Sequence, residues 1–141
     1  LSVSKKDTLY TSAADEYKKR LSRFVDIEFQ SVPHSDKDGE GSKTLSKIKP
    51  SDYVMLLDER GSIIKSEAFA ELIENRMNDS VQRMVIIIGG AYGVSNKVVE
   101  RANYTLSFGA MVWPHALCSV MLLEQIYRAY TILNNIPYHN E

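Results

Sequence analysis

Hydrophobic and polar positions follow two different periods in the first part of this chain. Apolar residues recur at every fourth position within residues 8–23, and this spacing predicts an amphipathic helix. Apolar and polar residues then alternate from Val25 to Gln30, which is the period of a strand. Residues 35–41 are polar and contain glycine, so a mobile loop is expected there. A short helix is predicted over Thr44–Ile48, and Pro50 ends it.

The rest of the chain alternates between short apolar runs and helical patterns. Further strands are predicted at Leu1–Ser4, Tyr53–Leu57, Met84–Ile88 and Tyr104–Phe108, and helices at Ser66–Met77, Ser95–Asn103 and His115–Leu133. Ser66 and Ser95 are the expected helix caps, and Gly61 is the expected turn. This alternation predicts an α/β fold, with a mostly parallel sheet and helices on both faces. Ligands bind such sheets beyond the carboxyl ends of the strands.

Composition and charge narrow the class of protein. The 141 residues are 44% hydrophobic and 25% charged, which is ordinary for one globular domain spanning residues 1–141. The formal net charge is −1, which excludes an overall basic field that would recruit nucleic acid. Lys18, Lys19, Arg20 and Arg23 form a local basic cluster, for which a solvated helix face is the ordinary interpretation.

The cysteine and histidine residues argue against disulfides and metals. Cys118 is the single cysteine, so no intrachain disulfide can form, and a cytoplasmic location is expected. His34, His115 and His139 are far apart in the sequence and do not have the spacing of zinc ligands, so no metal is expected. No apolar run approaches the length of a membrane span, and no membrane partner is expected.

A glycine-rich bend follows the most apolar predicted strand. Ile88 leads into Gly89-Gly90-Ala91-Tyr92-Gly93, and glycine lets a backbone approach a ligand closely. The spacing differs from the dinucleotide fingerprint G-x-G-x-x-G, and the Lys-Ser/Thr of a phosphate-binding loop is absent. The bend is therefore either a backbone cradle for a small molecule or a tight strand-to-helix connection without a ligand.

Three further motifs carry side-chain chemistry. Pro114-His115 stands at a predicted helix start, where a buried, satisfied histidine is the more common role. Glu124 and Arg128 are four residues apart on one helix, which is also the spacing of an ordinary intrahelical ion pair. Pro137-Tyr138-His139 lies near the chain end, and its rings suggest that the tail docks on the protein.

Taken in order, these segments resemble the RlmH-type ribosomal RNA methyltransferases, a minimal branch of the SPOUT class. The resemblance covers essentially the whole chain and lies in the order and spacing of several motifs. It rests on Leu57-Asp58 with Gly61, Ile88-Gly89-Gly90 with Gly93, Leu106-Ser107 followed by Pro114-His115, and Glu124-Gln125-Ile126-Tyr127-Arg128-Ala129 through Pro137-Tyr138-His139.

The resemblance implies an enzyme that uses S-adenosylmethionine. It implies methylation of N3 of a pseudouridine in large-subunit ribosomal RNA on the assembled ribosome, by a homodimer. It also implies that the C-terminal segment threads a trefoil knot, a topology that is rare among folds. A non-catalytic, knotted ribosome-associated protein and a methyltransferase acting on another RNA are the alternatives.

The resemblance also implies the site residues. The donor pocket would use Leu57, Gly90, Gly109, Ala110, Met111, Val112, Trp113 and Pro114. The catalytic candidates are His115, Glu124, Arg128, Tyr138 and His139, with Tyr138 and His139 placed first for RNA contact. The identity of a general base stays open among His115, Glu124, Tyr138 and His139, and positioning alone is an alternative to a base.

The chain departs from the family pattern at two positions. Ser119 stands where an arginine is common, so a positive charge is absent there. Tyr92 stands where relatives carry a polar or acidic residue. The missing arginine is the main support for the non-catalytic alternative.

Overall fold

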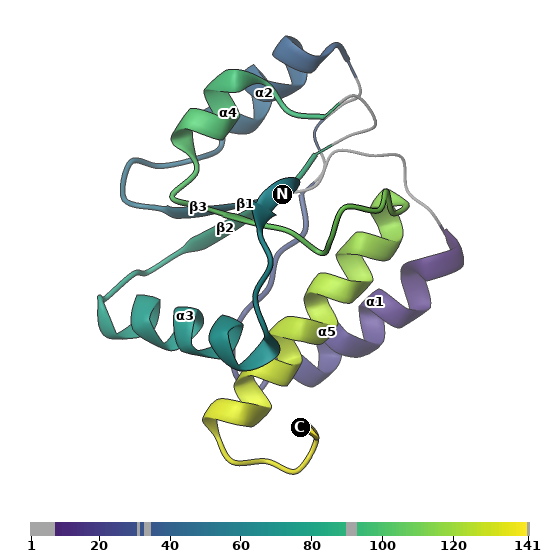
Figure 1. The fold of residues 1–141 in the computed structure, drawn as a ribbon, viewed down its shortest axis with the longest axis vertical. Helices are drawn as coiled ribbons and strands as arrows, with labels where there is room; N and C mark the ends of the chain where they lie inside the picture. Colours follow the sequence, from purple (N-terminus) through teal and green to yellow (C-terminus); the bar gives the residue numbers. More distant parts are fainter. Residues whose placement is uncertain (1–7, 31, 33–34, 90–92, 141) are drawn as a thin grey trace.

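The computed structural model describes residues 8–30, 32, 35–89 and 93–140. A parallel sheet at its centre has the strand order β2-β1-β3, where β1 is Tyr53–Ser62, β2 is Met84–Ile88 and β3 is Tyr104–Leu106. The α/β class and the parallel sheet predicted from the sequence are therefore confirmed (Figure 1). The strand predicted at Leu1–Ser4 lies outside the described residues.

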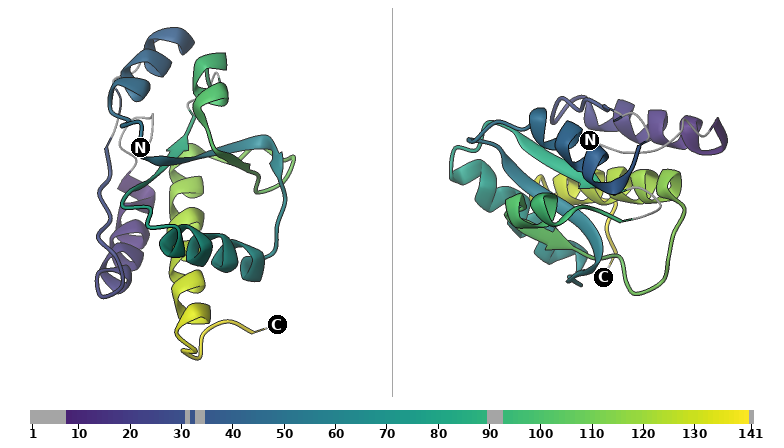
Figure 2. Two further views of the ribbon diagram at one scale, coloured as in Figure 1. Left: turned by 90° about the vertical axis from the view of Figure 1, so that its left-hand side faces the viewer. Right: turned by 90° about the horizontal axis from the view of Figure 1, so that it is seen from above.

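Helices flank the sheet on both faces. On one side lie α2 (Lys37–Ser46) and α4 (Asn96–Arg101), and on the other lie α3 (Ser66–Asn78) and α5 (His115–Leu133), as the turned view in Figure 2 shows. The first helix, α1 (Thr8–Leu21), packs on α5 (Figure 1).

The alternation of side chains along β1 builds two separate cores. Val54 and Leu56 face the first side and pack with Val98 of α4. Met55 faces the other side and packs with Phe69 of α3. All of these side chains are buried, and burial of an aliphatic or aromatic side chain stabilises a fold by about 1.5–3 kcal/mol.

Several helices and strands match the sequence prediction closely. The bounds of α5 and of β2 are those predicted, and α3 extends one residue beyond Met77. The side chain of Ser95 caps α4 by accepting from the amide of Val98 at 3.4 Å, as expected. The predicted helix over residues 8–23 ends at Leu21.

Two predictions in the first part of the chain are wrong. The strand expected from Val25 to Gln30 has no regular secondary structure, because alternating exposure alone does not supply a hydrogen-bonded neighbour. The loop expected over residues 35–41 contains the start of α2, capped by Asp36, which accepts from the amide of Gly39 at 2.8 Å. A Cβ at Gly41 would lie 2.3 Å from Ser95 Oγ, so glycine lets α2 approach the N-cap of α4.

Two local predictions around β1 and α3 are also wrong. Gly61 does not form a turn but lies inside β1, which continues to Ser62 and pairs there with Leu106. Ser66 is the first residue of α3 rather than its cap, and its hydroxyl donates to Gln125 Oε1 at 2.7 Å. Both residues therefore lie against parts of the chain that are distant in sequence, Gly61 against β3 and Ser66 against α5.

Candidate functional site

The carboxyl ends of the three strands meet at one edge of the sheet. In the strand register, Leu57 lies between Ile88 of β2 and Leu106 of β3. The segments that follow these residues are those in which the sequence placed the ligand site. The fold therefore brings the three segments together, as expected for parallel strands.

A close backbone approach joins the last residues of β1 to the end of β3 and to the residues that follow it. A Cβ on Gly61 would lie 2.6 Å from the carbonyl oxygen of Thr105, so only glycine fits there without movement of the backbone. The buried Ser107 hydroxyl lies 3.2 Å from the carbonyl oxygen of Glu59 and accepts from the amide of Gly109 at 3.0 Å. Gly109 has φ +109°, a conformation that favours glycine.

The loop that leads from β3 to α5 exposes apolar side chains. Met111 is 73% exposed and Val112 is 89% exposed, and Trp113 is also partly open to solvent. Pro114 then precedes the first residue of α5. Large apolar side chains that gather on an exposed loop mark an interaction surface more often than singly scattered ones.

His115 connects this loop to the end of β2. Its Nε2 lies 3.3 Å from the carbonyl oxygen of Ile88. A carbonyl only accepts, so Nε2 carries the proton and Nδ1 is an acceptor. Nδ1 is buried and has no partner among the described residues. Burial lowers the pKa of His115 below its usual value, and the ring is therefore neutral at physiological pH.

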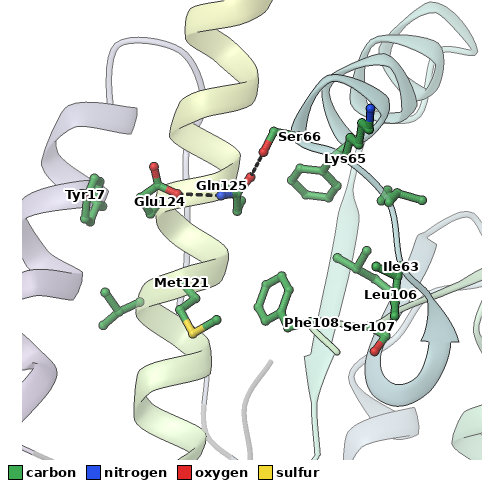
Figure 3. A pocket seen from close by; sticks show the side chains of 13 residues that line it. Tyr17, Ile63, Lys65, Ser66, Leu106, Ser107, Phe108, Met121, Glu124 and Gln125 are labelled. Atoms are coloured by element: carbon green, nitrogen blue, oxygen red, sulfur yellow. Dashed lines mark hydrogen bonds between the residues drawn. The ribbon is translucent and has the colours of Figure 1, made fainter. Parts of the chain in front are cut away.

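A cavity of about 450 Å³ lies between the end of β3, the start of α3 and the middle of α5 (Figure 3). Its walls are mostly apolar, with Glu124, Gln125 and Ser107 supplying polar atoms. The volume lies in the range of small-molecule sites, roughly 300–1,000 Å³. The full lining is Tyr17, Ile63, Ile64, Lys65, Ser66, Phe69, Leu106, Ser107, Phe108, Val120, Met121, Glu124 and Gln125.

Glu124 is the centre of a hydrogen-bonded cluster beside this cavity. Its carboxylate accepts from Arg128 Nη2 at 2.7 Å and from Arg128 Nε at 3.0 Å. It also accepts from the Tyr138 hydroxyl at 3.0 Å and from Gln125 Nε2 at 2.9 Å. Burial, with hydrogen bonds to Tyr17 and Glu124, raises the pKa of Tyr138 far above its usual value. The Tyr138 hydroxyl is therefore a donor and not a proton acceptor at neutral pH.

The predicted catalytic residues fall into two groups. Glu124, Arg128, Tyr138 and His139 are hydrogen-bonded to one another, so the prediction that the tail docks on the protein is confirmed. His115 lies apart from them, at the end of β2. The cavity is lined by Glu124 and by residues 106–108 at the end of β3, but not by His115 or by any residue of β2.

The predicted donor-pocket residues lie at the sheet edge. Leu57 directly follows the buried residues 54–56 of β1, and residues 109–114 lie in the loop between β3 and α5. Gly90 and Tyr92 lie outside the described residues. None of the described donor-pocket candidates lines the cavity itself, whose nearest members in the chain are residues 106–108.

Sequence reasoning missed several polar residues at this site. Ser66 and Gln125 join α3 to α5 beside the cavity, and Tyr17 lies on its wall. Glu67 contacts the C-terminal tail. These contacts join residues that are far apart in the chain, and among these residues only Gln125 stands in one of the motifs quoted from the sequence. The departing residue Ser119 faces a groove beside β2 with Leu122, not the cavity.

Comparison with known proteins assigns the family. The family model described as "Predicted SPOUT methyltransferase" matches residues 1–139. The chain belongs to the SPOUT methyltransferase family. The resemblance predicted from the sequence is thereby confirmed. "Ribosomal RNA large subunit methyltransferase H" of Clostridium botulinum (strain 657 / Type Ba4) is 41% identical over 153 aligned positions, which cover 99% of this chain and 96% of the relative.

Further comparisons agree with this SPOUT assignment. The protein of the same name from Christiangramia forsetii is 39% identical, over 88% of this chain and 85% of the relative. The structure of a probable methylase family protein from Haemophilus influenzae Rd KW20 aligns with a TM-score of 0.60, covering 99% of this chain and 69% of that one. At 12% identity this match shows the shared fold alone. No described helix of the chain is long and apolar enough to cross a membrane.

Proposed function

We propose that this protein is an S-adenosylmethionine-dependent methyltransferase of large-subunit ribosomal RNA. The names of the two relatives support the class of substrate, and membership of the SPOUT methyltransferase family supports the chemistry. The proposed target atom is N3 of a pseudouridine, reached on the assembled ribosome in the cytoplasm. Residues 1–141 are proposed to act as one domain.

The observation that carries this proposal is the cavity at the carboxyl edge of the sheet. It has the volume of a small-molecule site, and Glu124 and Gln125 supply polar groups at one wall. Outside the cavity, the buried Nδ1 of His115, which has no partner among the described residues, is a further acceptor at the same edge. The polar wall of the cavity would receive the flat base of the RNA substrate, and the donor-pocket candidates Leu57 and residues 109–114, which do not line the cavity, would hold the adenosyl group beside it.

The methyl donor would be held by Leu57, Gly90 and the loop of residues 109–114. S-adenosylmethionine supplies an electrophilic methyl group on a sulfonium. Leu57 and the loop between β3 and α5 offer apolar walls for a flat base, and the amide of Gly109 holds the start of this loop by donating to Ser107 Oγ at 3.0 Å. His115 ties the start of α5 to the residue before the glycine bend and keeps the two segments together.

Glu124 and Arg128 would orient the RNA substrate. The imide proton at N3 must leave during methylation, and Glu124 is the anionic group that lines the cavity among the five catalytic candidates. Arg128 donates from both Nε and Nη2 to one oxygen of Glu124, Oε1, and so restrains the direction of the carboxylate. Tyr138 donates to the same carboxylate, which makes it an orienting group and not the base.

A methyl-transfer assay tests the activity directly. Ribosomes from a strain that lacks this methylation should accept labelled methyl groups from S-adenosylmethionine, and the product should be a pseudouridine methylated at N3. Isolated RNA transcript should react far more slowly, because a net charge of −1 gives little general attraction to free RNA. If the ribosomes take up no labelled methyl groups, the non-catalytic alternative is favoured. If a different nucleoside carries the label, it identifies another RNA target.

Calorimetry tests the donor site separately from turnover. S-adenosylmethionine should bind the free protein. If a titration to millimolar ligand gives no heat of binding, the proposal that the protein binds this methyl donor is wrong. Gly90→Leu should abolish binding, because a side chain there would fill the proposed backbone cradle. Asp15→Asn is a matched control, since Asp15 is exposed on α1.

Two features of the assembly are part of the same proposal. The exposed Met111 and Val112 beside the site support a partner surface, and a second copy of the chain is the proposed partner. Sedimentation should give a homodimer, and Val112→Asp should weaken it. The C-terminal trefoil knot is likewise proposed from the family, and a crystal structure that traces residues 89–115 would test it.

A further inference from the structure

The C-terminal tail is joined to the start of α3 by one short hydrogen bond. Nε2 of His139 lies 2.6 Å from Oε1 of Glu67, although the two residues are 72 positions apart. His139 is mostly buried, with 16% of its side chain exposed, whereas Glu67 is 42% exposed. Glu67 lies in the first turn of α3, which packs on α5.

Arg128 determines which nitrogen of His139 carries the proton. Nη1 of Arg128 lies 3.0 Å from Nδ1 of His139. A guanidinium has donors and no acceptor, so Nδ1 must accept this hydrogen bond. The proton of a neutral imidazole is then on Nε2, where it is donated to Glu67. Both ring nitrogens are therefore occupied, and Arg128, His139 and Glu67 form a continuous chain of hydrogen bonds.

Tyr138 is held by a second set of contacts, which shares Arg128 with His139. Its ring packs edge-on against Tyr127 at 4.9 Å, and the Arg128 guanidinium lies 4.8 Å from the ring centre. Its hydroxyl donates to Glu124, which lines the cavity. Two consecutive tail residues are thus tied to two helices, Tyr138 to α5 and His139 to both α5 and α3.

We propose that Glu67 is a positioning residue that docks the C-terminal tail, through His139, against α3 and α5. With Glu67 in place, His139 is a neutral Nε2–H imidazole, and Arg128 and Tyr138 keep the Glu124 carboxylate in one orientation at the cavity. The catalytic consequence rests on the proposed function, whereas the docking itself does not depend on it. His139 then acts through the position of its neighbours and not as a proton acceptor.

Nuclear magnetic resonance of the full chain tests the docking. In the wild type, long-range nitrogen–proton correlation should show His139 with the proton on Nε2, and its amide should be ordered on the picosecond-to-nanosecond timescale. Glu67→Ala should lower the order of the His139 amide. Glu67→Gln should preserve it, because the amide oxygen still accepts from Nε2. Glu71→Ala is the matched control, since Glu71 is exposed one turn later on the same helix.

Kinetics with ribosomes separates positioning from a general effect on α3. Glu67→Ala should lower kcat/KM about two- to tenfold, the range for loss of one hydrogen bond, while Glu71→Ala stays near wild type. The double variant Glu67→Ala/His139→Ala should lose no more activity than His139→Ala alone. A larger loss in the double variant would show that Glu67 acts elsewhere and would overturn the proposal.

The two proposals fail in different ways. A His139 proton on Nδ1 in the wild type, or an unchanged His139 amide in Glu67→Ala, would overturn the docking role whatever the enzyme does. Absence of methyl transfer by the wild type would overturn the proposed function, and the resonance measurements would still decide the docking.

Discussion

His115 Nε2 donates to the carbonyl oxygen of Ile88, so the first residue of α5 is tied to the last residue of β2. The glycine bend begins directly after Ile88, and the loop of donor-pocket candidates ends directly before His115. One side chain thus holds together two segments of the proposed methyl-donor site. Its other nitrogen is buried without a partner among the described residues, and is free to accept from a ligand or from water.

Replacement of His115 should therefore weaken binding of the methyl donor. His115→Ala removes the hydrogen bond to Ile88 and the buried acceptor. We expect the dissociation constant of S-adenosylmethionine to rise about tenfold, which corresponds to a loss of about 1.4 kcal/mol in the free energy of binding. Calorimetry measures the change. Ser119→Ala is the control one turn along α5, because its hydroxyl only reaches the carbonyl of His115. Equal affinity for wild type and His115→Ala would remove His115 from the site.

The sequence predicted the parts of this fold that depend on local patterns. The apolar run of β2 and the long helix α5 were predicted to the residue, since each contains a strong and uninterrupted pattern. Val25 to Gln30 shows the limit of this reasoning. The segment alternates like a strand, yet a strand exists only where a neighbour pairs with it, and pairing is a long-range property.

The site was predictable only where motifs mark it. Glu124 and Tyr138 were found from their motifs, and the structure joins them. Glu67 and Ser66 carry no motif, because their partners, His139 and Gln125, come from the other end of the chain. Contacts of this kind become visible only when the fold has placed the two segments side by side.

An added methyl group at Gly61 should damage the sheet edge. In Gly61→Ala the Cβ would lie 2.6 Å from the Thr105 carbonyl oxygen and 2.8 Å from the Leu106 carbonyl carbon, and both are backbone atoms that cannot rotate away. Overpacking of this kind costs about 1–3 kcal/mol. Urea denaturation should show this loss, and S-adenosylmethionine should bind more weakly. If stability and affinity both match the wild type, the close approach of β1 and β3 is not present in solution.

Acid should weaken the ion pair that ties the start of β1 to β2. The Asp52 carboxylate is buried, with 2% of its side chain exposed, and Arg83 Nε donates to it at 2.9 Å. The Arg83 hydrogen bond holds the pKa of Asp52 below its usual value. A carboxyl with a lowered pKa stabilises the fold above its unfolded pKa of about 3.9, and this contribution is lost as the pH falls through the folded pKa.

Asp52→Asn tests this sign. At pH 7 the variant should be less stable than the wild type by about 1–3 kcal/mol, and the difference should shrink below about pH 4. Urea unfolding over a pH series measures both values. Asp15→Asn, which changes an exposed carboxylate on α1, should leave stability within about 0.5 kcal/mol at every pH. A constant difference down to low pH would mean that Asp52 acts through packing and not through its charge.

The hydroxyl of Tyr138 should matter as a donor and not as an acid that ionises. Tyr138→Phe keeps the ring against Tyr127 but removes the hydrogen bond to Glu124. We expect the rate of methyl transfer to fall about two- to tenfold. Because the pKa of Tyr138 is raised above its usual value of about 10, the hydroxyl stays protonated across the working range, and the pH–rate profile of the variant should keep the wild-type shape. An ionisation that is present in the wild-type profile below pH 10 and absent in Tyr138→Phe would instead make Tyr138 the proton acceptor.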